Sequence, residues 1–108
     1  MKMKILTILD NATRGLDAAN EFLLEECGKQ ISLNELSNVV LAYQHGHDGL
    51  TVMARERGVS SAAMTGAMDS MEYKGLAERV RDADRRKILV NLTERGMEVL
   101  RKASLASV

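Results

Sequence analysis

Residues 58–93 read GVSSAAMTGAMDSMEYKGLAERVRDADRRKILVNLT, and they contain the strongest fold signals of the chain. An apolar stripe at helical spacing runs through its first half: Met64, Ala67, Met68 and Met71. This spacing predicts a helix over residues 61–73, with a serine of the preceding turn as its N-cap and Gly75 as its terminator. The core beneath that helix must be built from methionine and aliphatic side chains, because aromatic residues make up only 3% of the chain.

After Gly75 the apolar pattern changes from helical to alternating. Apolar and polar residues follow one another at period two over residues 76–80 and again over residues 88–92. Two alternating runs joined by a short polar segment predict a β-hairpin. The connection, residues 81–86, reads RDADRR and is charged throughout except for one alanine.

A helix–turn–helix is predicted just before the hairpin. A short helix over about residues 50–57 ends at Gly58, where the turn into the next helix begins. The sequence HGHDG at residues 45–49 is the most turn-like stretch of the chain. Asp48 is expected to cap the short helix, because Gly49 offers no side chain for that purpose.

The N-terminal part of the chain predicts two further helices. Apolar residues at three- and four-residue intervals indicate one long amphipathic helix over residues 1–27, loosened at Gly15 and ended by Gly28. Ser32 and Glu35 then form a capping box at the start of a second helix. The residues expected on the inner face of this second helix are Leu33, Leu36, Val39, Val40 and Tyr43.

A last helix is expected from Thr93 and Glu94 to about Ala106. The fold class is therefore mainly α with a small β-hairpin, with four helices before the hairpin and a fifth after it. A chain of 108 residues is predicted to form one domain over residues 1–108.

From Gly58 to Thr93 the order of residues closely resembles the MarR family of winged helix-turn-helix regulators. The residues that carry the resemblance are Gly58-Val59-Ser60, Thr65, Asp69, Met71-Glu72, Gly75-Leu76, Glu78-Arg79, Asp84-Arg85-Arg86 and Val90-Asn91-Leu92-Thr93-Glu94-Arg95-Gly96. The resemblance implies a dimeric, sequence-specific DNA-binding transcription regulator, formed around residues 50–93. In such a protein residues 61–73 are the recognition helix, which lies in the major groove of double-stranded DNA, and residues 81–87 are the wing, which reaches the minor groove.

The wing supplies the basic residues of the implied DNA site. By match to the family motif, Arg86 would be the arginine of the minor groove and Asp84 would orient it, while Arg85 and Lys87 would lie near phosphates, with Arg81 at the base of the loop. A guanidinium in a narrow minor groove meets an enhanced negative potential. The alternative interpretation is a solvated turn with surface ion pairs worth less than about 1 kcal/mol.

The recognition helix departs from the family pattern because its outward face carries no basic residue. The outward candidates are Ser61, Ala62, Thr65, Gly66, Asp69 and Ser70. Direct readout of bases would fall to Ser61, Thr65 and Ser70, and Ser60, Ala62 and Gly66 complete the predicted contact surface. This face also favours a second hypothesis: a winged-helix protein–protein interaction module, such as an adaptor, phage accessory factor or anti-regulator, with weak or no DNA binding.

Residues 1–28 are expected to dimerise the chain, since only residues 94–108 remain after the wing to support a homodimer. A third hypothesis is a groove for a small-molecule effector between the first two helices and the DNA-binding lobe. His45, His47 and Asp48 form a weak metal signal and are interpreted as exposed loop residues, and Cys27 as an idle thiol.

Charge and composition exclude several other classes of function. The net charge is zero, but residues 1–50 carry four basic and seven acidic groups (−3) and residues 51–108 carry eleven and eight (+3). No apolar run approaches the roughly 18 residues of a membrane span, and a single cysteine agrees with the reducing cytoplasm. With no phosphate loop and no nucleophile motif, we expect no enzyme, no metal and no cofactor.

Overall fold

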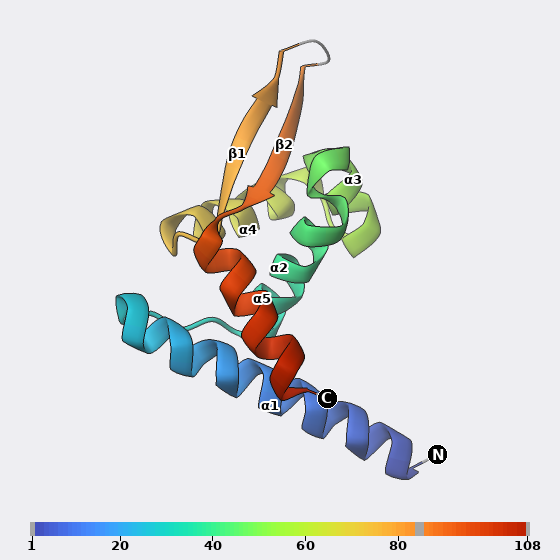
Figure 1. The fold of residues 1–108 in the computed structure, drawn as a ribbon. Helices are drawn as coiled ribbons and strands as arrows, with labels where there is room; N and C mark the ends of the chain where they lie inside the picture. The colour runs from blue at the N-terminus through green and yellow to red at the C-terminus, as the bar shows by residue number, and fades with distance from the viewer. Residues whose placement is uncertain (1, 84–85, 108) are drawn as a thin grey trace.

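The computed structural model describes residues 2–83 and 86–107. Within them, helices and a hairpin follow one another in the predicted order (Figure 1). The elements are α1 (Lys2–Cys27), α2 (Leu33–His45), the 3-10 turn η1 (Gly46–Asp48), α3 (Leu50–Arg57), α4 (Ser61–Tyr73), β1 (Ala77–Asp82), β2 (Lys87–Leu92) and α5 (Glu94–Ala106). The predicted fold class, mainly α with a small β-hairpin, is confirmed.

Helix α1 runs along one end of the molecule and α5 packs across it, while the hairpin projects from the opposite end (Figure 1). The prediction that α1 loosens at Gly15 is wrong, because the helix is continuous from Lys2 to Cys27. Gly15 provides close packing instead: a Cβ atom there would lie 3.1 Å from the carbonyl oxygen of Ala103 on α5. Gly28 ends the helix with φ +68°, as expected of a C-terminal glycine.

Helix α2 begins with the predicted capping box. The Ser32 hydroxyl accepts a hydrogen bond from the Glu35 N–H at 3.1 Å, and the Glu35 carboxylate accepts one from the Ser32 N–H at 3.0 Å. Its predicted inner face is only partly correct. Leu33 and Tyr43 are 51% and 57% exposed, because they lie at the two ends of the helix, where each borders an open surface groove.

The start of α3 differs from the prediction that Asp48 caps it. Gly49, with φ +107°, occupies the N-cap position, and no side chain caps this helix. The carboxylate of Asp48 lies instead 3.2 Å from Nδ1 of His45 and 3.5 Å from Nε2 of His47. Within residues 2–83 and 86–107, no group of three or more His, Cys, Asp or Glu residues could hold a metal ion.

The core lies beneath α4, whose predicted apolar stripe is confirmed. Met64, Met68 and Met71 are fully buried. They belong to one cluster with side chains from the other elements, of which the largest are Leu23, Val39, Met53, Leu76, Val90 and Val99. Helix α4 is therefore held on the body by the packing of its methionine side chains, from Met64 to Met71.

Strands β1 and β2 pair antiparallel, in a register that runs from Ala77 opposite Leu92 to Asp82 opposite Lys87. The strands extend further than predicted, so Arg81 and Lys87 are strand residues. The hairpin projects into solvent (Figure 1), so these charged side chains stay exposed. Their backbone groups can therefore continue the hydrogen-bonded pairing of the two strands. In the part of the chain that the structure describes, no helix is long and apolar enough to span a membrane.

Candidate nucleic-acid interface

The N-terminal half of α4 presents a small, uncharged surface. The Ser60 hydroxyl accepts a hydrogen bond from the Ala63 N–H at 3.1 Å and so caps the helix, as predicted. Four of the predicted contact residues on the helix are exposed: Ser61, Ala62, Thr65 and Gly66. A Cβ atom at Gly66 would meet no heavy atom within 4 Å, so this position is open to an approaching partner.

Ser70 does not lie on that open surface. Its residue is half-buried, and its hydroxyl donates a hydrogen bond of 2.7 Å to Oε2 of Glu35 on α2. The prediction of an outward Ser70 is wrong, because this side chain turns toward α2 at the end of α4 that lies against the body. Its hydroxyl is already bonded within the protein, so Ser70 is not part of the exposed surface of α4.

The Asp69 side chain also has a partner within the protein, in a cluster of charged residues that the sequence analysis did not predict. Arg79 on β1 donates from Nε to Oε1 of Glu72 at 2.9 Å, and its guanidinium also pairs with Asp69. The Arg79 backbone N–H donates to Oε2 of Glu72 at 3.2 Å. The hydrogen bonds that Arg79 donates lower the pKa of Glu72, and its bonds to the carboxylates of Glu72 and Asp69 raise the pKa of Arg79. The cluster joins the recognition helix to the base of the wing.

The sequence contains a signal that could have predicted this cluster. Two acidic residues lie three positions apart on α4, and an arginine follows on the next strand. All three belong to the motif that carries the MarR resemblance. In this part of the motif the charged groups pair with one another and link α4 to β1.

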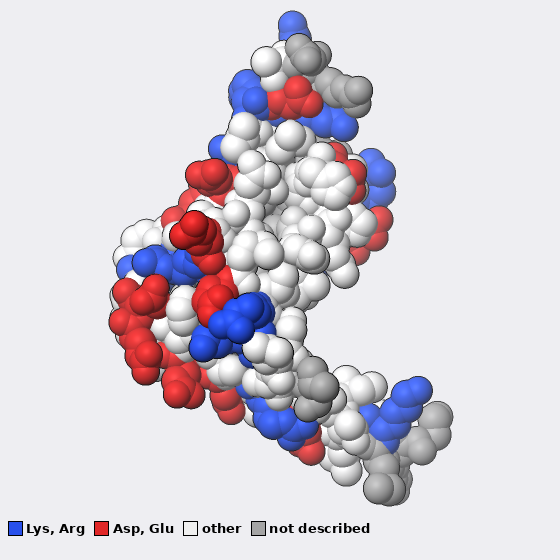
Figure 2. All heavy atoms as spheres, viewed as in Figure 1, with Lys and Arg blue, Asp and Glu red and all other residues white. Residues whose placement is uncertain are grey.

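The described basic residues of the wing are exposed to solvent, and two of them, Arg86 and Lys87, also border a hollow beside α3. Arg81, Arg86 and Lys87 are exposed, and Figure 2 shows Lys and Arg side chains gathered at the hairpin end of the molecule. Arg86 has φ +55° and donates its N–H to the Asp82 carbonyl at 3.0 Å, which closes the turn. The other two predicted wing residues, Asp84 and Arg85, lie outside the described residues.

A hollow of about 370 Å³ lies between the wing and α3. Its lining residues are Asp48, Gly49, Leu50, Thr51, Val52, Arg55, Arg86, Lys87 and Ile88. Arg55, which sequence reasoning did not single out, therefore joins two predicted DNA contacts. Three of the lining residues, Arg55, Arg86 and Lys87, are basic and one, Asp48, is acidic, so the lining of this hollow carries an excess of positive charge.

Two grooves whose linings are mostly apolar border α5. One, of about 630 Å³, is bordered by Tyr43 of α2, Leu92 of β2 and Met97 and Leu100 of α5. The other, of about 240 Å³, lies between α1, α2 and α5. Figure 2 shows a broad uncharged surface between the wing and α1.

No protein-family model and no curated protein sequence matches the chain. Solved structures, however, do match it. The transcriptional regulator BldR from Sulfolobus solfataricus superposes with a TM-score of 0.61 at 26% identity, over 97% of this chain and 75% of that one. A MarR mutant from E. coli, complexed with operator DNA, superposes with a TM-score of 0.66 at 18% identity, over 92% of this chain and 69% of that one. This chain has the MarR-type winged-helix fold.

A third structure, Rv1404 from Mycobacterium tuberculosis, superposes with a TM-score of 0.66 at 21% identity, over 99% of this chain and 74% of that one. The structural likeness therefore covers 92–99% of this chain. The chain spans between about two thirds and three quarters of the length of these three structures.

Proposed function

We propose that this chain is a sequence-specific, DNA-binding transcription regulator of the MarR type. Helix α4 would enter the major groove through Ser60, Ser61, Ala62, Thr65 and Gly66. The wing would reach the adjacent minor groove through Arg86, with Arg81 and Lys87 near phosphates. The observation that carries the proposal is a helix–turn–helix with an open recognition surface, joined to a basic hairpin that stands clear of the body.

The two parts of this interface would contribute differently. The short side chains of α4 cannot make the bidentate arginine–guanine contacts that are the commonest specific kind. The bases would therefore be read by the hydroxyl groups of Ser61 and Thr65. Gly66, which has no side chain, would allow the helix to approach the bases closely. Most of the affinity would come from the wing and from the cations of the hollow beside α3, so binding should depend strongly on salt.

The test is an anisotropy titration of the upstream region of the gene that encodes the chain, at two salt concentrations, with Arg86→Ala beside the wild type. We expect the substitution to weaken binding by about 1–3 kcal/mol, the cost of losing a specific base contact. Arg14→Ala is the matched control, because Arg14 is exposed on α1, at the other end of the molecule from the wing. Tight binding that ignores Arg86→Ala would contradict the wing assignment.

We further propose a homodimer. Four large apolar side chains in the first third of α1, Ile5, Leu6, Ile8 and Leu9, are each 56–59% exposed, and Leu105 at the end of α5 is 63% exposed. Each such side chain is worth about 1.5–3 kcal/mol when it is buried. A second copy of the chain packed on this surface would cover them and place two recognition helices on one duplex.

The larger apolar groove supports a further element of the proposal, a small-molecule effector. Its volume of about 630 Å³ falls within the range of about 300–1,000 Å³ that is typical of ligand pockets. It lies beside α5, which packs on α1, so an occupant could influence the dimer. We expect the protein to act in the cytoplasm, without enzymatic activity and without a cofactor.

A second candidate function is a protein–protein interaction module. The uncharged exposed face of α4 favours it, because uncharged surface contributes nothing to phosphate attraction. Retention on DNA at low salt separates the two functions. If neither the upstream region nor an unrelated duplex is retained, while a purified partner protein protects α4 from amide exchange, the chain is such a module.

A further inference from the structure

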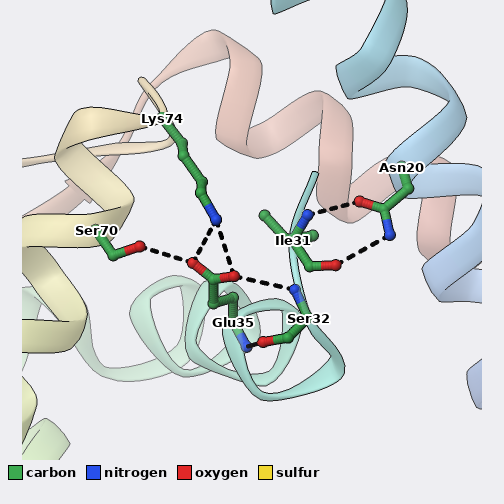
Figure 3. A network of polar contacts seen from close by, with 6 residues as sticks. All are labelled: Asn20, Ile31, Ser32, Glu35, Ser70 and Lys74. Carbon is green, nitrogen blue, oxygen red and sulfur yellow. Dashed lines mark hydrogen bonds and ion pairs between the residues drawn. The ribbon is translucent and has the colours of Figure 1, made fainter. Parts of the chain in front are cut away.

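The carboxylate of Glu35 joins two helices that are far apart in sequence. Ser70 on α4 donates to Oε2 at 2.7 Å, and Nζ of Lys74 lies 2.9 Å from Oε1 and 2.8 Å from Oε2 (Figure 3). The Ser32 N–H donates to Oε1 at 3.0 Å as part of the capping box. We call Ser32, Glu35, Ser70 and Lys74 the Glu35 junction.

The junction is sheltered and charged. The side chains of Glu35 and Lys74 are only 21% and 17% exposed. Burial acts to raise the pKa of Glu35, but the hydrogen bonds from Lys74, Ser70 and Ser32 outweigh it and hold that pKa below its ordinary value. The carboxylate is therefore ionised at neutral pH, and charge-assisted hydrogen bonds of this kind are roughly twice as strong as neutral ones.

The junction also continues toward α1. The residue before Ser32 is Ile31, which is 5% exposed and whose two backbone groups bond to the side-chain amide of Asn20 on α1 (Figure 3). The Ile31 N–H donates to Oδ1 at 2.7 Å, and Nδ2 donates to the Ile31 carbonyl at 3.0 Å. One continuous set of polar contacts thus runs from α1 through the start of α2 to the end of α4.

The polar side chains that tie α4 to other elements lie in its second half and at its C-cap, Lys74. Ser70 and Lys74 hold it to α2, while Asp69 and Glu72 hold it to β1. Residue 61 lies nine residues, or about 13 Å, from residue 70 along the helix axis. A tilt of about 10° at the anchored end would move the open surface by about 2 Å, more than the tolerance of about 0.5 Å in a hydrogen-bond length.

We propose that Glu35 is a positioning residue, which fixes the direction of α4 against α2 and thereby aims the exposed α4 surface at its target. The proposal rests on the proposed function, because that target is taken to be DNA. Glu35 itself touches no nucleic acid. Its role is to hold the end of the recognition helix through two donors, one from Ser70 and one from Lys74.

The test compares Glu35→Gln with the wild type. The carboxamide oxygen of glutamine can still accept from the Ser32 N–H, and its NH2 group can donate to the Ser70 hydroxyl, so the capping box and α2 should form normally. It loses the charge that holds Lys74. Glu21→Gln is the matched control, since it makes the same change of charge at an exposed position on α1. Lys74→Gln is a second variant that leaves the capping box complete, should Glu35→Gln fail to fold.

Two readouts are made on the full chain. The first is hydrogen–deuterium exchange of residues 68–76 without DNA, which should become faster in Glu35→Gln and in Lys74→Gln but not in Glu21→Gln. The second is affinity for the upstream region and for an unrelated duplex of equal length. We expect about a tenfold loss on the upstream region only, the size expected when one base contact is misplaced.

Unchanged exchange in residues 68–76 would overturn the proposal. So would faster exchange with the same DNA affinities as Glu21→Gln, because the junction would then stabilise the fold without aiming the helix. If the wild type retains neither duplex, the proposed function fails, and the exchange measurement alone decides whether Glu35 holds α4.

Discussion

At the scale of single residues, Gly96 determines how closely α5 approaches the start of the hairpin. A Cβ atom at this position would lie 2.0 Å from the Leu76 carbonyl oxygen and 3.3 Å from Cδ2 of Leu92. The first of these atoms belongs to the backbone and cannot rotate away. The sequence marks this glycine only as part of a family motif, and its packing explains why that motif contains glycine.

We expect Gly96→Ala to lower the free energy of unfolding by about 1–3 kcal/mol, the usual cost of overpacking. Gly66→Ala is the matched control, because Gly66 also lies inside a helix but has open space around it. That control should raise stability by about 0.5–1 kcal/mol through helix propensity. Urea denaturation followed by circular dichroism measures both. Equal effects of the two substitutions would show that the Leu76 contact is not tight.

Arg86 combines a charge with a left-handed backbone. Its φ of +55° is unfavourable for a residue with a Cβ atom. Glycine removes this cost and the guanidinium together, whereas alanine removes only the guanidinium. We therefore expect Arg86→Gly to be more stable than Arg86→Ala by about 1 kcal/mol, while both lose DNA affinity equally. Unequal DNA affinities would show that the turn, and not the charge, matters for binding.

At the scale of elements, the Glu35 junction makes the contact between α2 and α4 sensitive to pH. The folded pKa of Glu35 lies below its ordinary value of 4.5. The unfolded chain therefore takes up the proton first as the pH falls. The stability that ionised Glu35 contributes is complete above pH 4.5 and is lost as the pH falls below it. We expect the denaturation midpoint of the wild type to fall more steeply in this acid range than that of Glu35→Gln. Parallel pH profiles would contradict this account.

The elements themselves could largely be predicted from the sequence, because their signals are local. The capping box at Ser32 and the methionine stripe of α4 each depend on residues within a few positions of one another. What could not be predicted depends on residues far apart in the sequence. Ser70 was expected to face outward, but it bonds to a carboxylate 35 residues earlier, and no helical periodicity encodes that partner.

The same distinction applies to the candidate site. The exposed face of α4 and the basic wing follow from pattern and resemblance, whereas the contribution of Arg55 to the hollow beside the wing depends on how α3 docks. Asp48 shows the limit of a local rule: it stands where a cap is expected, yet its carboxylate pairs with two neighbouring histidines instead.

At the scale of the whole molecule, the exposed apolar residues of α1 predict self-association. We expect Leu9→Glu to convert the dimer to a monomer, because the charge would be buried against the second copy at a large desolvation cost. Gln30→Glu, at an exposed position after α1, is the control and should remain dimeric. Size-exclusion chromatography with light scattering measures the mass of each. A wild type that is already monomeric would contradict the proposed dimer.

Whether the chain reads DNA can be measured by selecting binding sites from a random pool of DNA duplexes, because the protein then enriches its own operator from all sequences in the pool. If the chain reads DNA as a dimer through α4 and the wing, the wild type should enrich an inverted repeat whose half-sites lie about one helical turn apart, roughly 10 base pairs. Arg86→Ala should enrich it poorly under the same salt. Failure of the wild type to enrich any sequence, at low as well as moderate salt, would contradict the claim that this winged helix reads DNA.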